Sequence, residues 1–202
     1  MATSEALHDR FGRNVVFLLL VRLGEGGDAL AEVVEAVRAA GASVGRVNMS
    51  SMEPGALVYE LMLFVHDDDE MNAVRASVEA IEGVEVADVV DMALQSHRGG
   101  ACEVRSRSPI RSNTDLRIVY TPGVARVCKL VQADPAAAYE YTNIANRVAI
   151  ATNGTAILGL GDIGPLAGLP VMEGKAAIFW EFAGVSADPV LIDTQDPEEF
   201  ID

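Results

Sequence analysis

Two side chains in the second half of the sequence, Tyr120 and Lys175, could move protons in a reaction. Tyr120 precedes Thr121-Pro122-Gly123, which predicts an extended stretch ending at Tyr120, followed by a helix with Thr121 as N-cap and Pro122 in its first position. This arrangement places Tyr120 at the positive end of a helix, where anions bind favourably. Taken alone, a tyrosine at the end of a strand also fits a packing role.

Lys175 is one of only two lysines in a chain that contains 13 arginines. Arginine keeps its proton in proteins, whereas a lysine can release it and then act as a general base. The apolar run Ala176-Ala177-Ile178 follows Lys175, and burial among such neighbours favours the uncharged amine. A surface lysine whose stem lies along an apolar surface would show the same local sequence.

The composition is that of a globular protein without a nucleic-acid or membrane footprint. Half of the 202 residues are hydrophobic and the formal net charge is −15, which argues against nucleic acid and anionic membranes as partners. Residues 1–13 lack the apolar centre of a signal peptide, and no apolar run is long enough to span a bilayer, so we expect a cytoplasmic protein. Cys102 and Cys128 lie too far apart for a zinc or redox motif, so we expect reduced thiols and no metal site of the His/Cys kind.

Charge is distributed unevenly along the chain and suggests two domains. Residues 1–95 contain 6 Lys and Arg against 17 Asp and Glu, whereas residues 96–202 contain 9 against 13. The basic stretch 96–112 holds four arginines, two glycines and a proline without helical periodicity, which is typical of a solvated linker. We therefore predict a first domain at 1–95, a linker at 96–112 and a second domain at 113–202.

The first domain has the pattern strand, helix, strand, strand, helix, strand, which is the ferredoxin-like arrangement. Apolar β-rich runs and helical periodicity predict strands at 14–22, 43–52, 56–65 and 84–92, and helices that begin at Asp28 and within 67–70.

The glycine-containing turn before Asp28-Ala29-Leu30, together with AAGASV after the helix, resembles the ACT family of regulatory domains. The resemblance implies an amino-acid effector near Leu23–Leu30, and we expect this domain to bind a small ligand or to self-associate through its sheet. The alternative is a ferredoxin-like domain without a ligand.

In the second domain, residues 148–152 and 156–160 read as two strands joined by an Asn153-Gly154 hairpin turn. Residues 159–164 match G-x-G-x-x-G, but a dinucleotide site requires a helix directly after this motif. Pro165, Gly168 and Pro170 follow, so we expect no such helix and interpret the glycines as a close-packed turn.

Three blocks of the second half resemble the N-terminal domain of bacterial-type malic enzymes. They are YTPGVARVCK at 120–129, NRVAIATNGTAILGLGDIGPLAGLPVMEGKAAIFWEFAG at 146–184, and DPVLIDTQDP at 188–197. The resemblance covers residues 98–202 and implies an α/β fold overall, with the ferredoxin-like ACT domain preceding the malic enzyme domain. It also implies that Tyr120 is the general acid and Lys175 the general base in the oxidative decarboxylation of malate to pyruvate.

The resemblance further implies NAD or NADP and Mg²⁺ or Mn²⁺ as cofactors of a longer, homo-oligomeric enzyme. The family's metal-binding carboxylates and its nucleotide-binding domain belong to sequence beyond residue 202, so we assign no cofactor or metal residue here and expect the isolated chain to be inactive. The acidic residues near the terminus, Asp193, Asp196, Glu198 and Glu199, fall in a polar turn and are not assigned to a metal. The alternative function is a stand-alone sensor in which the ACT domain binds an amino acid and the malic-type domain is not catalytic.

Overall fold

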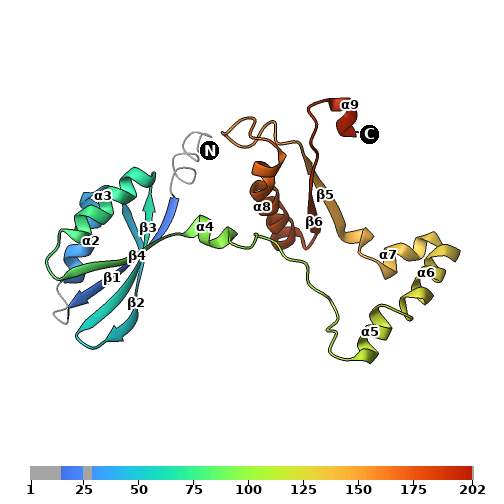
Figure 1. The fold of residues 1–202 in the computed structure, drawn as a ribbon, viewed down its shortest axis with the longest axis horizontal. Coiled ribbons are helices and arrows are strands. Elements are labelled where there is room, and N and C mark those ends of the chain that lie inside the picture. Colours follow the sequence, from blue (N-terminus) through green and yellow to red (C-terminus); the bar gives the residue numbers. More distant parts are fainter. Residues whose placement is uncertain (1–14, 25–28, 202) are drawn as a thin grey trace. The chain divides into compact units, whose positions relative to one another are not determined.

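The chain divides after Arg98 into two units, Met1–Arg98 (unit 1) and Gly99–Asp202 (unit 2), in a computed structural model that describes residues 15–24 and 29–201. Both units mix helices and strands, which confirms the predicted α/β class (Figure 1). The predictions for residues 1–13 and for Asp28 as a helix N-cap lie outside the described residues.

Unit 1 has the predicted ferredoxin-like order. Its four strands form one antiparallel sheet in the order β2-β3-β1-β4, and α2 and α3 cover one face of it (Figure 1). The elements are β1 (Val15–Gly24), α2 (Ala29–Ala39), β2 (Ser43–Glu53), β3 (Ala56–Val65), α3 (Asp68–Glu79) and β4 (Val84–Asp91).

The core of unit 1 lies between this sheet and its two helices. Side chains alternate between the two faces of a strand, so every second residue of β1 points inward, and Leu19 and Val21 are fully buried. Val33 and Val37 on α2 and Val74 on α3 meet them from the helix side. The apolar residues that repeat with helical or strand periodicity in the sequence are therefore the ones that form the core. For this reason the fold of unit 1 could be predicted from the sequence.

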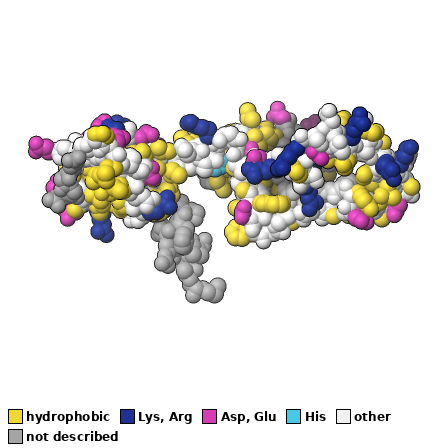
Figure 2. Space-filling model, turned by 90° about the horizontal axis from the view of Figure 1, so that it is seen from below, with side chains coloured by type: hydrophobic (Ala, Val, Ile, Leu, Met, Phe, Trp, Pro, Cys, Tyr) yellow, Lys and Arg dark blue, Asp and Glu magenta, His cyan; other side chains and the backbone are white. Residues whose placement is uncertain are grey.

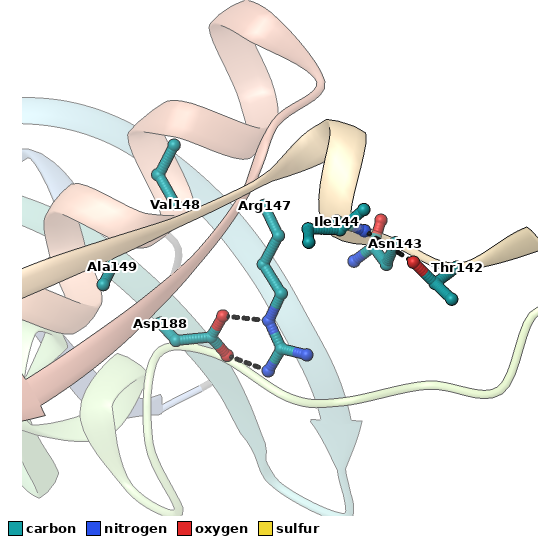
Figure 3. Close-up of a pocket in the computed structure, with 7 residues that line it drawn as sticks. All are labelled: Thr142, Asn143, Ile144, Arg147, Val148, Ala149 and Asp188. Carbon is teal, nitrogen blue, oxygen red and sulfur yellow. Dashed lines mark hydrogen bonds and ion pairs between the residues drawn. The ribbon is translucent and has the colours of Figure 1, made fainter. Parts of the chain in front are cut away.

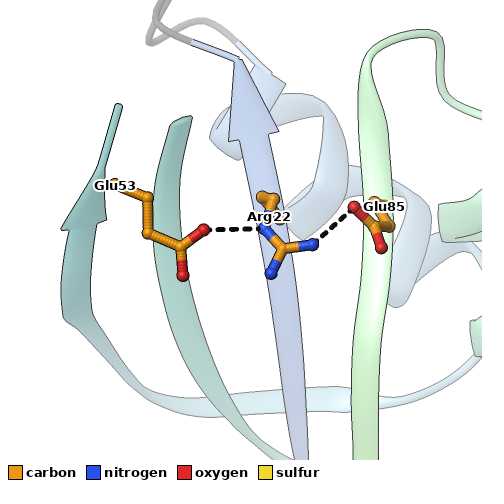
Figure 4. Close-up of polar contacts among 3 residues, drawn as sticks. All are labelled: Arg22, Glu53 and Glu85. Atoms are coloured by element: carbon orange, nitrogen blue, oxygen red, sulfur yellow. Dashed lines mark hydrogen bonds and ion pairs between the residues drawn. The ribbon is translucent and has the colours of Figure 1, made fainter. Parts of the chain in front are cut away.

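On the opposite face of the sheet, one ion cluster joins three strands. The guanidinium of Arg22 on β1 donates from Nη1 to Glu85 Oε2 at 2.7 Å and from Nε to Glu53 Oε2 at 3.1 Å (Figure 4). Glu85 lies on β4 and Glu53 on β2. All three side chains are partly exposed, so the cluster helps to align the strands but contributes little to stability.

A short helix not expected from the sequence, α4 (Met92–His97), follows β4 directly. The Asp91 carboxylate accepts hydrogen bonds from the Ala93 and Leu94 amides, which caps the helix and ends the strand at Asp91.

Unit 2 consists of a helical segment followed by a strand–helix–strand unit. Strands β5 and β6 are parallel, and α8, which connects them, packs against both (Figure 1). The elements are α5 (Asn113–Val119), α6 (Val124–Ala133), the 3-10 turn η1 (Pro135–Ala137), α7 (Ala138–Tyr141), the 3-10 turn η2 (Ile144–Asn146), β5 (Arg147–Thr152), α8 (Pro165–Ala183), β6 (Ser186–Leu191) and α9 (Pro197–Ile201). None of the described helices is both long enough and apolar enough to cross a membrane.

The structure corrects the prediction around Tyr120. The residues before it form helix α5 rather than an extended stretch, because the Ser112 hydroxyl accepts a hydrogen bond from the Asp115 amide and caps a helix there. The next helix begins at Val124, so Thr121 is not its N-cap and Pro122 is not its first residue.

The structure also corrects the prediction for residues 153–183. No hairpin forms at Asn153-Gly154, and residues 156–160 are not a strand, because β5 pairs with the distant β6 instead. A helix does follow the glycine motif, so our expectation that prolines prevent one was wrong. Pro165 takes the first position of α8, where a missing N–H costs nothing, and the 19-residue helix continues through Pro170.

Candidate functional site

Tyr120 sits at the junction of two helices. As the C-cap of α5, its amide donates to the Leu116 carbonyl at 2.8 Å, and its own carbonyl accepts from the Val124 amide at 2.7 Å. The backbone of Tyr120 is therefore fixed from both sides, while its side chain is 65% exposed. The side chain of Tyr120 thus starts from a fixed backbone position and is open to a ligand.

Gly123 makes this junction possible. A Cβ at this position would collide with the Arg117 carbonyl and would lie 2.6 Å from the Ile118 carbonyl oxygen. The Gly123 amide donates to the Arg117 carbonyl at 2.8 Å, so the chain turns tightly over the end of α5. The YTPG motif thus needs its glycine for close approach of two backbone segments.

Lys175 lies in the middle of α8. Met172 and Ala176 lie on the same side of the helix as each other and are buried, whereas Lys175 is exposed. The desolvation expected from its apolar sequence neighbours is therefore not found among the described residues. Its ammonium group faces solvent and, like the Tyr120 phenol, is accessible to a ligand.

The structure does not bring Tyr120 and Lys175 together. α8 packs mainly on β6 and β5, whereas α6 packs on α5 and η1, so the two residues belong to different parts of unit 2 (Figure 1). Among the described residues no hydrogen bond joins their side chains, and neither lines the two cavities described below.

The first cavity, about 420 Å³, is lined by an ion pair that was not predicted from the sequence. Arg147, the first residue of β5, contacts the Asp188 carboxylate of β6 through Nε and through Nη2, the latter at 2.8 Å (Figure 3). This hydrogen bonding lowers the pKa of Asp188 below its ordinary value. Asn143 and Thr142 line the same cavity from the segment before β5. The sequence signal that could have predicted this ion pair is an arginine at the start of one apolar strand and an acidic residue in the other.

The second cavity, about 610 Å³, lies at the start of α8 and includes Gly164, Pro165 and Asp193. Two turns meet near it, since a Cβ on Gly154 would collide with the backbone of Gly164. Ligands of parallel sheets bind at the carboxyl ends of the strands, and this cavity has that position beside β6. Asp162 accepts a hydrogen bond from the Gln195 side chain at 3.1 Å and so links the glycine turn to the terminal segment.

Figure 2 shows one face of the surface, where acidic and basic side chains are interspersed with hydrophobic ones. In residues 15–24 and 29–201, no three His, Cys, Asp or Glu side chains are placed to hold a metal ion together. Cys102 and Cys128 are both free and exposed. Burial and the nearby Glu173 carboxylate raise the pKa of the Cys102 thiol.

The comparisons with known proteins identify unit 2. Residues 100–202 match the family model described as "Malic enzyme, N-terminal domain". The chain belongs to the malic enzyme family. This confirms the resemblance seen in the YTPG and glycine-lysine blocks.

The similarity to curated relatives extends into unit 1. The NAD-dependent malic enzyme 1 of Bacillus subtilis is 46% identical over 173 residues, which is 85% of this chain and 39% of that protein. The NAD-dependent malic enzyme of Geobacillus stearothermophilus is 40% identical over 173 residues, or 86% of this chain and 36% of that protein. The chain therefore spans less than two fifths of the length of these relatives, and their likeness extends well beyond residues 100–202.

Solved malic enzymes share the fold of unit 2. The malic enzyme of Pyrococcus horikoshii has a TM-score of 0.52 and 49% identity, covering 55% of this chain and 27% of that one. The NAD-dependent malic enzyme of Thermotoga maritima has a TM-score of 0.51 and 40% identity, covering 54% of this chain and 31% of that one.

We predict that Arg147→Ala lowers the Tm of the chain at pH 7, because it removes the pair that joins β5 to β6. The folded-state pKa of Asp188 is depressed, so the stability it provides is present above the unfolded carboxyl value of about 3.9 and is lost as pH falls through the folded value. The Tm difference from wild type should therefore shrink as the pH is lowered below about 4, as measured by circular dichroism.

Arg126→Ala on α6 is the control, since Arg126 forms no ion pair within the described residues. A Tm difference for Arg147→Ala that is equally large at pH 7 and at pH 3 would show that packing, rather than the ion pair, causes it.

Proposed function

We propose that this chain is the N-terminal part of an NAD(P)-dependent malic enzyme, which oxidatively decarboxylates malate to pyruvate and CO₂. The observation that carries the proposal is the match of residues 100–202 to the malic enzyme N-terminal domain, with Tyr120 and Lys175 inside the matched segment. The names of the relatives support a nicotinamide cofactor, NAD in the two that match over most of the chain.

The two cofactors of the reaction do not fit the described residues. No three carboxylates converge on a metal position, and the glycine motif 159–164 is not preceded by a strand as a dinucleotide site requires. We therefore assign Mg²⁺ or Mn²⁺ and NAD(P) to the rest of the enzyme, and derive only the proton transfers from this chain.

In the proposed reaction, Lys175 accepts the proton of the malate C2 hydroxyl. The nicotinamide, when bound, would accept the C2 hydride. After CO₂ is lost, the C3 carbon of enolpyruvate needs a proton, and the Tyr120 phenol supplies it. A neutral phenol is an acid at neutral pH, whereas a lysine is a base only as the uncharged amine. The proposal therefore requires that Lys175, exposed here, is buried in the assembled enzyme. Both side chains are exposed, which leaves them free to meet one substrate in the assembled enzyme.

We further propose a cytoplasmic homo-oligomer in which unit 1 is an ACT-like regulatory domain. The ferredoxin-like topology of unit 1 supports the ACT-like fold. Leu23 and Leu30 flank the segment where the effector is expected, and residues 25–28 between them are outside the described residues. The second candidate is the stand-alone sensor, which the ferredoxin-like topology of unit 1 also fits.

In the full-length protein that contains these residues, we predict that Lys175→Ala lowers the rate of malate oxidation by roughly 10² to 10⁴, because general base catalysis is lost. It should leave the decarboxylation of added oxaloacetate largely intact. Tyr120→Phe keeps the ring and removes only the proton, so it should slow pyruvate formation from oxaloacetate without lowering the Tm. NAD(P)H absorbance and a coupled pyruvate assay measure the two steps.

Lys129→Ala, which removes the only other lysine, and Tyr139→Phe, at another exposed tyrosine, are the matched controls. Turnover near the wild-type value in Lys175→Ala or Tyr120→Phe would defeat that residue's assignment.

For unit 1, we predict a rise in Tm with at least one amino acid or carboxylate metabolite, because a ligand that binds only the folded state stabilises it. The measurement is a thermal melt of the chain against the twenty amino acids and common metabolic carboxylates, combined with light scattering. No shift with any of these compounds, together with a monomeric mass, would leave a ferredoxin-like domain without regulatory function.

A further inference from the structure

Glu173 of α8 holds the start of unit 2 against this helix. Its Oε2 accepts a hydrogen bond from the Ala101 amide at 2.9 Å, and its backbone carbonyl accepts one from the Cys102 thiol at 3.2 Å. A Cβ on Gly100 would lie 3.4 Å from Glu173 Oε1, so the carboxylate is in contact with the backbone of residues 100–102. The side chain of Glu173 thus binds Ala101 and its main chain binds Cys102, 72 and 71 positions earlier in the sequence.

The geometry of the helix relates this contact to Lys175. Gly168, Met172 and Ala176 are the buried residues of α8 and mark the side that faces the sheet. At about 100° per residue, Glu173 lies on one flank of that side and Lys175 on the other. A hold on the Glu173 flank therefore limits rotation of α8 about its own axis and fixes the direction in which Lys175 projects.

Such a hold adds to the packing of the buried side. The helix is apolar nearly all round, and Ile178, Trp180 and Phe182 stay exposed, so hydrophobicity distinguishes its faces only weakly. A hydrogen bond to a charged carboxylate is directional and stronger than one between neutral groups.

We infer that Glu173 is a positioning residue for Lys175: it clamps residues 100–102 to α8 and thereby orients the helical turn that carries the catalytic base. This inference rests on the proposed function for the role of Lys175, but the clamp itself is independent of it.

The first test measures the clamp without any catalysis, through the alkylation rate of Cys102 by iodoacetamide in the 202-residue chain, followed by peptide mass spectrometry. Glu173→Ala frees the 100–102 segment and removes a carboxylate that raises the thiol pKa, so both effects increase the rate. We expect an increase of about tenfold relative to Cys128, the exposed reference cysteine on α6. Glu173→Gln removes the charge but keeps an acceptor oxygen for the Ala101 amide, so it should show only the part of the increase that comes from the lower thiol pKa.

Glu181→Ala, at an exposed acidic residue of the same helix, is the control and should leave the ratio unchanged. A ratio in Glu173→Ala that is unchanged, or that is no higher than in Glu173→Gln, would overturn the clamp.

The second test uses the full-length protein. Glu173→Ala should lower kcat for malate oxidation by roughly 10-fold to 100-fold with little change in KM, because the base is misplaced rather than removed. Glu173→Gln should recover most of kcat, and Glu181→Ala should match wild type. A general loss of folding would instead lower the Tm and the active fraction, and Glu173→Gln would not reverse it selectively in kcat.

The outcomes separate the two claims. If Cys102 becomes reactive while kcat is unchanged, the positioning role is overturned and the proposed function stands. If Lys175→Ala retains full activity, the proposed function of that lysine fails and the positioning role fails with it, whatever the alkylation result.

Discussion

The parallel pairing of β5 with β6 is the constraint on which unit 2 depends. Parallel neighbours cannot be joined by a tight turn, so the chain must cross over, and α8 is that crossover. This single requirement places the glycine turns at the carboxyl end of β5, the long helix over the sheet, and Lys175 on the helix. The Arg147–Asp188 pair crosses the same two strands and helps to fix their register.

Glycines make the crossover sterically possible. Gly154 and Gly164 approach so closely that a side chain at Gly154 would collide with the backbone of Gly164, and Gly168 faces Ile157 with only 2.9 Å available for a Cβ. Gly154 and Gly164 also adopt positive φ angles of 76° and 79°, which are rarely open to other residues. Close packing therefore explains Gly154 and Gly168, and positive φ angles explain Gly161 and Gly164 of the glycine motif.

The sequence predicted unit 1 well and unit 2 poorly, for identifiable reasons. In unit 1, short-range periodicity and the core coincide, as the buried alternation of β1 around Leu19 shows. In unit 2, the partner of β5 lies more than 30 residues away, so Asn153-Gly154 looked like a hairpin turn. α8 was hidden because its uniform hydrophobicity gives no periodic signal and because Pro165 and Pro170 argue against a helix when read locally. Tyr120 and Lys175 are proposed from residue blocks rather than from geometry. The Glu173 contact spans 72 residues, and no local sequence pattern reveals it.

Unit 2 also exposes surfaces of the kind that larger assemblies cover. Parallel sheets are ordinarily covered on both faces, and Trp180 and Phe182 on α8 are exposed here. These features, like the separation of Tyr120 from Lys175, agree with the proposal that the active site is completed by protein beyond the described residues.

The most direct measurement compares NAD(P)H formation from malate and Mn²⁺ by the purified 202-residue chain and by the full-length protein in one assay. We expect turnover by the full-length protein only. Turnover by the 202-residue chain, or none by the full-length protein, would contradict the proposed function.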